Sequence, residues 1–579
     1  MTDSAVTSTT TGPAMQRRRI ETGRLLTYLF VALIALLVLP PVWTLLRTSF
    51  AERLPDGTEV FTLDNYALLV SEGRFLASAF NSLVFSLAST VVSLLLGGAV
   101  AWLVERTDVP FKRLAWFTTI VSLGTPFILY VTAWIYILGR AGPLNDLYRL
   151  VTGSRETLFD VNTLTGMIVV EGFIWAPLAF LLLSATFRAA NAEMEEAARM
   201  SGATVIQTIL RISLKLAFPA ILAFSLFAFI LNLEAFEVPA LIGMPGRVNV
   251  LTTDVYQAVK EIPPRVGFAS AFSVVMLVII SALLYCYGRI SRYAERFATI
   301  TGKGYRPRPI ALGRLRWAFS AIILVNFAVT LLLPLVAMVW MSVMPYVQPM
   351  RWQALSTATL QNFSAVLASS YYLSLVTTTL MVAAISATVT MCITLIAGWL
   401  AARRAPGGQA IDQLVVVPLI FPGVVLGVAL LEVALRLPFS LYGTMWLIIL
   451  AFVIHYMPFG MRYTYAGVIQ IHPELEQAAR VSGARGWALL SRILVPLLAP
   501  ALASGWLFIF LLSSKEMSLP LLLAGPNSQT ISVAMFDLWG NGQIGEVAAL
   551  GLLWAVLMTL FGAAFFLISR RRSAMTFGV

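Results

Sequence analysis

The sequence predicts an all-α polytopic membrane protein with about 12 transmembrane helices. Two observations carry this prediction: of the 579 residues 59% are hydrophobic and only 12% are charged, and the apolar residues form long runs. Soluble domains contain roughly 45–50% apolar and about 25% charged residues. A soluble fold of this composition would expose large apolar patches to water. A soluble enzyme, a fibrous protein and a disordered scaffold are therefore excluded.

The apolar runs fall into two sets of six, each run close to the roughly 20 residues that a spanning helix needs. They lie near 26–46, 77–104, 114–139, 165–187, 216–241 and 266–288, and then near 317–345, 371–401, 412–436, 441–469, 498–523 and 545–569. The first run is too long for a removed signal peptide, so we interpret it as an anchor. Residues 1–20 are predicted to form a disordered cytoplasmic tail.

The distribution of basic residues predicts the orientation. With the N-terminus inside, most of the 40 Lys and Arg lie on inside segments, as membrane topology favours. We therefore expect both termini in the cytoplasm. The net charge of +12 is explained by this topology, and no nucleic-acid partner is expected.

Two short segments occur twice in the chain. Residues 193–202 read EMEEAARMSG and residues 474–483 read ELEQAARVSG, at an offset of 281, whereas TLDNYALLV at 62–70 matches TLQNFSAVL at 359–367 at an offset of 297. The first half therefore carries about 16 extra residues, which we place in an outside loop at 140–164. An even number of spans in each half makes this a parallel repeat, with the predicted pathway where the halves meet.

The repeat defines the domain organisation. We expect a first domain at 21–292, a basic cytoplasmic linker at 293–314 and a second domain at 315–579.

The duplicated polar loop is the most informative segment. Acids open a short helix in each copy, where they suit the positive end of the helix dipole, small alanines follow, and a glycine then permits a left-handed turn. The residues concerned are Glu193, Glu195, Glu196, Ala197, Ala198 and Gly202 in the first loop, and Glu474, Glu476, Gln477, Ala478, Ala479 and Gly483 in the second. An ordinary solvated connector also uses good helix formers, but duplication with the glycine preserved favours a docking element.

With Ile212 after the first loop, and Ile493 and Pro496 after the second, these segments resemble the cytoplasmic EAA loop of permease subunits of ATP-binding-cassette (ABC) importers. The resemblance implies two fused six-helix permease domains in a bacterial plasma (inner) membrane, each loop docking on an ATPase subunit. It also implies two copies of that ATPase and a periplasmic or extracellular solute-binding protein. Two positions depart from the family: Gln477 replaces an acid, and Lys215 stands where proline is usual.

The sequence contains no GxxxxGK[ST] phosphate-binding loop. We therefore expect a transport subunit that is not an enzyme and that binds no cofactor itself, with ATP-Mg on the partner subunits. A secondary transporter driven by an ion gradient is the rival class, but such a carrier has no reason to keep the duplicated loop.

Ionisable groups in membrane spans are costly and therefore mark functional candidates. At equivalent points of the fifth and eleventh spans we find Asn232, Glu234 and Glu237, and Lys515 and Glu516. We interpret them as a candidate gate lining the pathway, with interfacial residues as the alternative. Glu171 and Glu432 are expected at solvated interfaces, and His455 as a hydrogen-bonded core residue.

The substrate is less strongly indicated. The fused layout and the runs EAFEVPAL and KEMSLPLLL resemble permeases of iron(III) importers, and hard carboxylate oxygens suit a hard cation. Thiamine, polyamine and phosphonate importers remain alternatives, although an anionic substrate fits paired acids poorly. The sequence does not identify a metal site.

Overall fold

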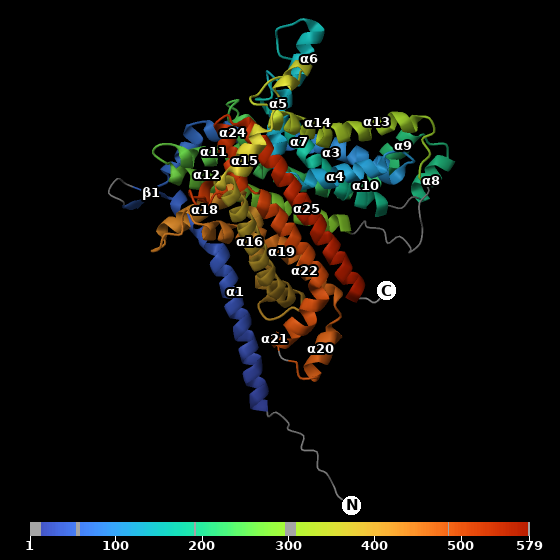
Figure 1. The fold of residues 1–579 in the computed structure, drawn as a ribbon. Coiled ribbons are helices and arrows are strands. Elements are labelled where there is room, and N and C mark those ends of the chain that lie inside the picture. The colour runs from blue at the N-terminus through green and yellow to red at the C-terminus, as the bar shows by residue number, and fades with distance from the viewer. Residues whose placement is uncertain (1–12, 54–57, 190–192, 296–308, 485, 577–579) are drawn as a thin grey trace, which may run out of the picture.

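The computed structural model describes residues 13–53, 58–189, 193–295, 309–484 and 486–576. Within these ranges, 11 helices are long and apolar enough to cross a membrane, or 12 if one bent pair counts as a single span. The only sheet in the described part of the chain is a two-stranded antiparallel hairpin. The prediction of an all-α polytopic membrane protein is confirmed (Figure 1).

The elements of the first half follow one another in this order: α1 (Pro13–Ser49), β1 (Ala51–Arg53), β2 (Glu59–Phe61), α2 (Asp64–Ser71), α3 (Arg74–Arg106), α4 (Lys112–Gly124), α5 (Phe127–Leu138), α6 (Pro143–Thr152), α7 (Leu164–Ala189), α8 (Glu193–Met200), α9 (Val205–Thr208), the π-helical turn η1 (Ile209–Ser213), α10 (Leu214–Glu234), the π-helical turn η2 (Pro239–Gly243), α11 (Leu251–Lys260) and α12 (Val266–Glu295).

The second half follows the same order, without counterparts of β1, β2 and α6 among the described residues: α13 (Leu315–Phe327), the π-helical turn η3 (Ala328–Leu332), α14 (Leu333–Val343), the 3₁₀ turn η4 (Trp352–Thr357), α15 (Gln361–Ala368), α16 (Ser370–Ala402), α17 (Gly408–Val416), the 3₁₀ turn η5 (Val417–Ile420), α18 (Gly423–Arg436), α19 (Met445–Gln470), α20 (Pro473–Val481), α21 (Gly486–Leu489), the π-helical turn η6 (Leu490–Leu494), α22 (Val495–Lys515), α23 (Pro520–Leu523), α24 (Ile531–Gly540) and α25 (Ile544–Thr576).

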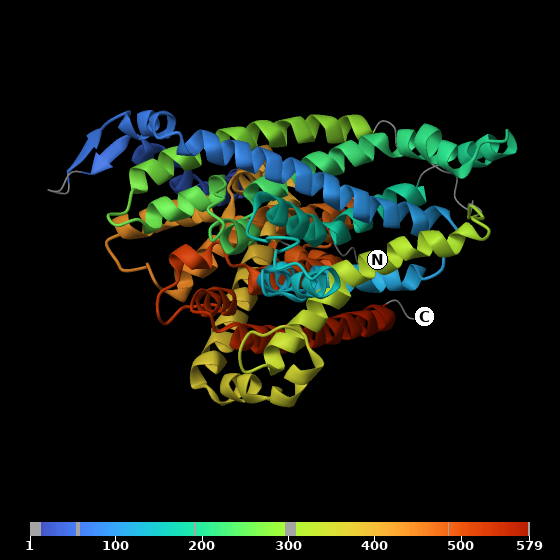
Figure 2. The ribbon, with the colours of Figure 1, turned by 90° about the horizontal axis from the view of Figure 1, so that it is seen from above.

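The two halves form diverging arms. In Figure 1 helices α3, α4 and α10 of the first half run toward α8 and α9 at the right, while α16, α19 and α22 run down toward α20 and α21. Figure 2 shows the first half, blue to green, lying beside the second, yellow to red. The two polar loops therefore stand at the ends of the two arms, and the halves meet at the other end.

The first helix of each half packs on the opposite half. Helix α1 lies against α17 and α18, and α13 and α14 lie against α3, α4 and α5. Ile34 and Val38 of α1, for example, are buried with Ile411 and Val415 of α17. This exchange interlocks the two arms.

The third span of each half is broken, where we predicted continuous helices at 114–139 and 412–436. Helices α4 and α5 are separated by Thr125 and Pro126, and the pair ending at Ile420 and starting at Gly423 bends by 106°. Pro126 and Pro422 explain both breaks, because proline removes a helical donor and disfavours the helical conformation in the residue before it. Hydropathy averaged over a run does not detect such a break.

Two further boundaries differ from the prediction. The 140–164 segment, expected to be a loop, contains helix α6, which projects from the body of the molecule (Figure 1). Arg351 of the second half anchors it through an ion pair of 2.7 Å with Asp146. Helix α1 begins at Pro13, inside the tail predicted for residues 1–20, whereas residues 1–12 and most of the linker at 293–314 lie outside the described residues.

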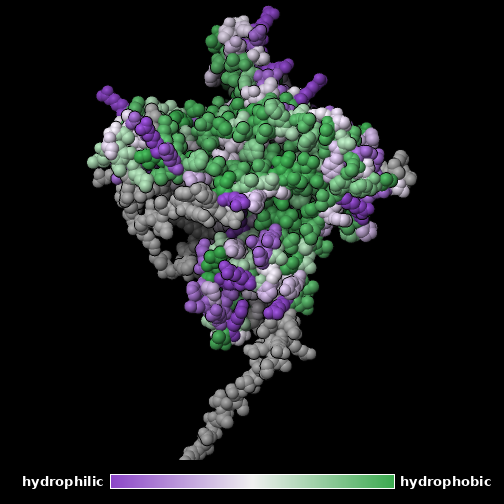
Figure 3. Space-filling view, turned by 180° about the vertical axis from the view of Figure 1, so that it is seen from behind, coloured by the Kyte–Doolittle hydropathy of each residue, from purple (hydrophilic) through white to green (hydrophobic). Residues whose placement is uncertain are grey.

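The surface supports the membrane assignment. Figure 3 shows a broad apolar area over the helices, with hydrophilic residues gathered at the lower end and at projecting tips. A surface dominated by apolar side chains between polar ends is what a bilayer stabilises.

The repeated TLxN segment has a structural role at the C-terminal ends of the first spans. Asn65 and Asn362 occupy equivalent positions in α2 and α15, and each donates two hydrogen bonds of 2.9–3.2 Å to backbone carbonyls at or just after the end of the first span of its half. Each asparagine thus holds a short helix against the end of a span, which accounts for its presence in both copies.

We expect Asn362→Ala to lower the free energy of unfolding by about 1–3 kcal/mol, because two partly buried carbonyls lose their donor. Thermal unfolding of the purified protein measures the effect. Gln361→Ala, at the exposed neighbouring position, is the matched control and should change the free energy little; equal effects of the two substitutions would contradict the assigned role.

Candidate functional site: two coupling loops and an acidic cavity

The two polar loops have the same backbone conformation. Helices α8 and α20 each end at a glycine with φ of +86°, at Gly202 and Gly483. After each glycine, a backbone N–H returns to the last turn, from Ala203 to Ala198 at 3.0 Å and from Ala484 to Ala479 at 2.9 Å. This is the hydrogen bond of a helix C-terminus closed by a left-handed residue. The left-handed turn expected from the sequence is confirmed in both copies.

Each loop exposes an apolar ridge at equivalent positions. Met194 and Met200 are 52% and 90% exposed on α8, and Leu475 and Val481 are 51% and 89% exposed on α20. The same exposure at equivalent positions makes these side chains candidates for a contact with another protein. Ala197 and Ala478 lie exposed on the same helices, where a small side chain permits close approach.

The acids of the loops divide into buried and exposed groups. Glu195 and Glu476 are only 4% exposed and point into their own half, whereas Glu474 and Gln477 are exposed and Glu196 is half-buried. The acid position that differs between the loops, Glu196 against Gln477, is less buried than the shared pair Glu195 and Glu476. The side chain of Glu193 lies outside the described residues.

The remaining loop residues form the floor beneath the short helices. Ala198 and Ile212 line an open surface groove together with Lys215. In the second loop, Ala479 is buried in an apolar cluster against which Ile493 packs. Pro496, the counterpart of Lys215, is exposed at the start of α22.

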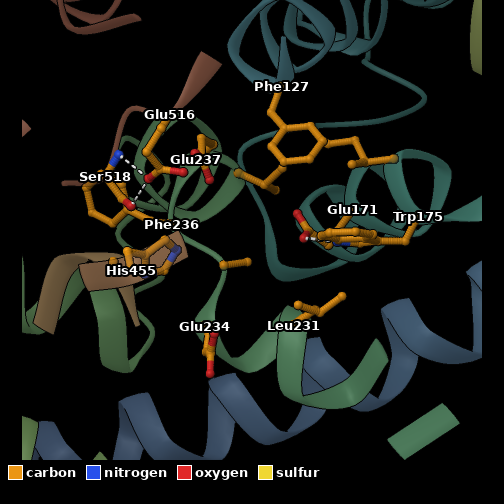
Figure 4. A pocket seen from close by; sticks show the side chains of 14 residues that line it. Phe127, Glu171, Trp175, Leu231, Glu234, Phe236, Glu237, His455, Glu516 and Ser518 are labelled. Atoms are coloured by element: carbon orange, nitrogen blue, oxygen red, sulfur yellow. Dashed lines mark hydrogen bonds between the residues drawn. The ribbon is translucent and has the colours of Figure 1, made fainter. Parts of the chain in front are cut away.

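A second polar site lies between the two halves. A cavity of about 120 Å³ is lined by residues of both halves, with four carboxylates among them. The lining residues are Phe127, Glu171, Ile174, Trp175, Leu231, Glu234, Ala235, Phe236, Glu237, Val238, Gly423, His455, Glu516 and Ser518. Figure 4 shows Glu237 beside Glu516, with Glu234 and Glu171 on other walls.

The cavity forms where helices are interrupted. Glu237 lies between α10 and η2, Glu516 directly follows α22, and Phe127 begins α5 after its break. An added Cβ at Gly423, the first residue of α18, would collide with Ser518. Glycine therefore allows the close approach of two chain segments at the cavity wall.

Only some of the carboxylate oxygens in the cavity accept hydrogen bonds. Glu516 accepts bonds from the backbone N–H and the hydroxyl of Ser518, and Glu171 accepts one of 2.8 Å from the Trp175 indole. Within the described part of the chain, Glu234 Oε1 and His455 Nδ1 have no hydrogen-bond partner. The cavity therefore contains polar atoms without a hydrogen-bond partner.

Two of the predicted gate residues lie outside the cavity lining. Asn232 is buried in the first half and donates to Thr90 Oγ1 at 3.0 Å. Lys515 crosses to the other half, where its Nζ donates to the Leu123 carbonyl at 2.9 Å and lies 4.7 Å from the centre of the Phe127 ring. Lys515 thus ties the two halves together beside the acids.

Three polar residues differ from their expected surroundings. Glu171, expected at a solvated interface, is buried and lines the cavity. His455, expected to be a hydrogen-bonded core residue, also lines the cavity, and its Nδ1 has no hydrogen-bond partner among the described residues. Glu432 is also buried and pairs with Arg436 at 3.4 Å. An isolated polar residue in an apolar span carries no local signal of the helix face on which it lies. No group of three or more potential metal ligands occurs among the described residues.

Comparison with known proteins assigns the chain to a family. The model of the "binding-protein-dependent transport system inner membrane component" matches residues 23–297 and again residues 391–574. Together these stretches cover most of the chain, one in each half.

The curated relatives are permeases as well. The ferric transport system permease protein FbpB of Actinobacillus pleuropneumoniae is 24% identical over 88% of this chain and 73% of its own length. A probable ABC transporter permease protein, y4fN of Sinorhizobium fredii, is 25% identical over 88% and 90%. The spermidine/putrescine transport system permease protein PotB of Escherichia coli is 28% identical over 46% and 96%.

Among solved structures, a bacterial ABC transporter that imports alginate matches with a TM-score of 0.38 and 19% identity, over 49% of this chain and 98% of its own. The two family matches, the relatives and the many apolar helices lead to one conclusion: the chain belongs to the binding-protein-dependent transport system inner membrane components, and it is a multi-pass permease subunit of an ABC importer, with ATP hydrolysis on separate subunits.

Proposed function

We propose that the chain forms the translocation pathway for a cationic substrate between its two halves, with iron(III) as the first candidate. The observation that carries the proposal is the cavity at the junction of the halves, where four carboxylates converge. Among the described residues that line the cavity there is no arginine or lysine, and Lys515 interacts electrostatically with Glu237 and Glu516 from beside it. The excess of carboxylates over this one ammonium favours a cation over an anion such as phosphonate.

The relatives narrow the choice of cation. Proteins similar to this chain over most of its length carry ferric transport in their names, and a shorter match carries spermidine and putrescine. Hard carboxylate oxygens suit a small trivalent cation as well as an ammonium group. Polyamine is therefore the alternative that the same cavity supports, and thiamine is a weaker one.

The rest of the machine follows from the two loops. Each loop receives one copy of a separate ABC ATPase, which carries the ATP-Mg, and a solute-binding protein delivers the substrate on the outer face. Both termini lie in the cytoplasm. The apolar ridges at Met194, Met200, Leu475 and Val481 are the surfaces that the ATPase covers.

The substrate is tested by uptake into proteoliposomes that contain the chain, its ATPase and its binding protein. We expect iron(III) supplied on the binding protein to accumulate in the presence of ATP, with excess spermidine or putrescine leaving uptake unchanged. ATP-driven accumulation of the polyamine, without accumulation of iron, would reverse the assignment. Accumulation of an anion would contradict a cationic pathway.

A further inference from the structure

The two coupling helices are joined to the membrane spans by equivalent ion pairs, each with a buried glutamate. In the first half, Arg106 Nε lies 3.5 Å from Glu195 Oε2, and the two side chains are 2% and 5% exposed. In the second half, Arg403 Nε donates to Glu476 Oε1 at 2.7 Å. Arg106 and Arg403 lie at the inner ends of α3 and α16.

The two pairs correspond through the internal repeat. Glu195 and Glu476 are related by the offset of 281 that relates the polar loops, and Arg106 and Arg403 by the offset of 297 that holds before the insertion. The pairing is therefore present twice, across segments that are far apart in the sequence. A chance surface contact has no reason to recur at both places.

Each glutamate has a second partner, which fixes its orientation. Ser213 in η1 donates to Glu195 Oε1 at 2.7 Å, and the Trp399 indole donates to Glu476 Oε2 at 3.2 Å. Arg403 also donates to the carbonyl of Ile471, two residues before α20, at 2.8 Å. Both carboxylate oxygens of each glutamate are thus occupied, so the short helix has little freedom to rotate about its attachment.

The backbone of Arg106 is also held in place by a hydrogen bond. The N–H of Ile310, at the end of the linker, donates to the Arg106 carbonyl at 2.8 Å. Ile310 and Leu312 are buried beside Trp102 and Leu103. The inner end of α3 is therefore fixed both by the coupling helix and by the chain that leads into the second half.

We infer that Arg106 and Arg403 are positioning residues of the coupling step: each holds its coupling helix rigidly on the span α3 or α16, so that force from the ATPase reaches the arm. The inference rests on the proposed docking of the ATPase at the two loops. A short helix ending in a glycine turn transmits a displacement only where its other contacts are stiff. An ion pair whose carboxylate is buried supplies such a contact, and removing one partner leaves the other charge unpaired.

The test is a mutant cycle on the second anchor in the reconstituted complex of the chain with its ATPase and binding protein. Arg403→Met and Glu476→Gln are each expected to lower the stimulation of ATP hydrolysis by the loaded binding protein at least fivefold. Because the two residues act as one unit, the double variant should be no worse than the more damaging single variant. Arg403→Lys, which keeps the charge, should restore part of the stimulation.

Arg404→Met is the matched control, since it removes a neighbouring exposed charge that makes no ion pair among those of the described residues. We expect it to keep stimulation within twofold of the original protein. Additive losses in the double variant, or equal losses for Arg403→Met and Arg404→Met, would overturn the inference.

A spectroscopic measurement separates the anchor from the docking of the ATPase. A spin label at Val481, in a chain whose Cys286 and Cys392 are replaced by serine, reports the motion of α20 without any partner. The label should become more mobile in Arg403→Met and stay unchanged in Arg404→Met. Unchanged mobility in Arg403→Met contradicts the anchor, whereas failure of the unaltered chain to bind the ATPase contradicts the proposed function alone.

Discussion

Replacing both Glu237 and Glu516 by glutamine is expected to lower cation uptake at least tenfold. The two residues face each other across the junction of the halves in one cavity. Glutamine keeps the shape and much of the hydrogen bonding but removes two negative charges from a site of low dielectric, where charge interactions are strong. A tenfold loss of rate corresponds to an activation free energy higher by about 1.4 kcal/mol. This is a small effect for the removal of two charges at membrane depth.

The measurement is initial uptake by proteoliposomes at several substrate concentrations, together with ATP hydrolysis. The double variant should still bind the ATPase, because the coupling loops lie at the far ends of the arms (Figure 1). The matched control is the double replacement by aspartate, which keeps both charges and should retain much of the activity. Normal uptake by the glutamine variant would exclude the cavity as a cation pathway.

Replacing both Gly202 and Gly483 by valine is expected to uncouple ATP hydrolysis from transport, with uptake falling at least tenfold. Both glycines have φ of +86°, and an added Cβ would meet no atom within 4 Å. The effect therefore comes from backbone conformation alone. A β-branched residue resists the left-handed region by roughly 1–2 kcal/mol, so the turn after each coupling helix is forced open.

Gly486→Val provides the control for this pair. Gly486 lies close to Gly483, also has open space around it, and is not among the residues with positive φ. We expect normal coupling in Gly486→Val, and continued membrane insertion of the Gly202 and Gly483 variant, judged by its yield from membranes. Uptake at the original rate in the double variant would contradict a coupling role for the turns.

Features that recur in the sequence were predictable. The two loops were predictable because their sequence occurs twice. In the structure, both have the same left-handed glycine and the same exposed apolar ridge. Glu237 and Glu516 were found because charged residues interrupt apolar runs at equivalent places, and they lie in one cavity. In both cases a short sequence pattern that occurs in each half was enough to predict the site.

Features that depend on a distant partner were not predictable. Arg106 and Arg403 looked like ordinary inside charges, because the glutamates that they hold lie many residues away. Their equivalence under the offset of 297 was the one available signal. Glu171 and His455 enter the cavity through the rotation of their helices, which packing decides and hydropathy does not record.

The central claim is that ATP, acting through the two loops, drives movement of substrate between the halves. It is tested most directly by uptake into proteoliposomes containing the chain, its ATPase and its binding protein, with all ion gradients collapsed by ionophores. The account predicts uptake that requires ATP on the cytoplasmic side of the chain, where the ATPase binds, and that stops when the ATPase is omitted. Uptake by the chain alone, driven by an imposed ion gradient and indifferent to ATP, would contradict it.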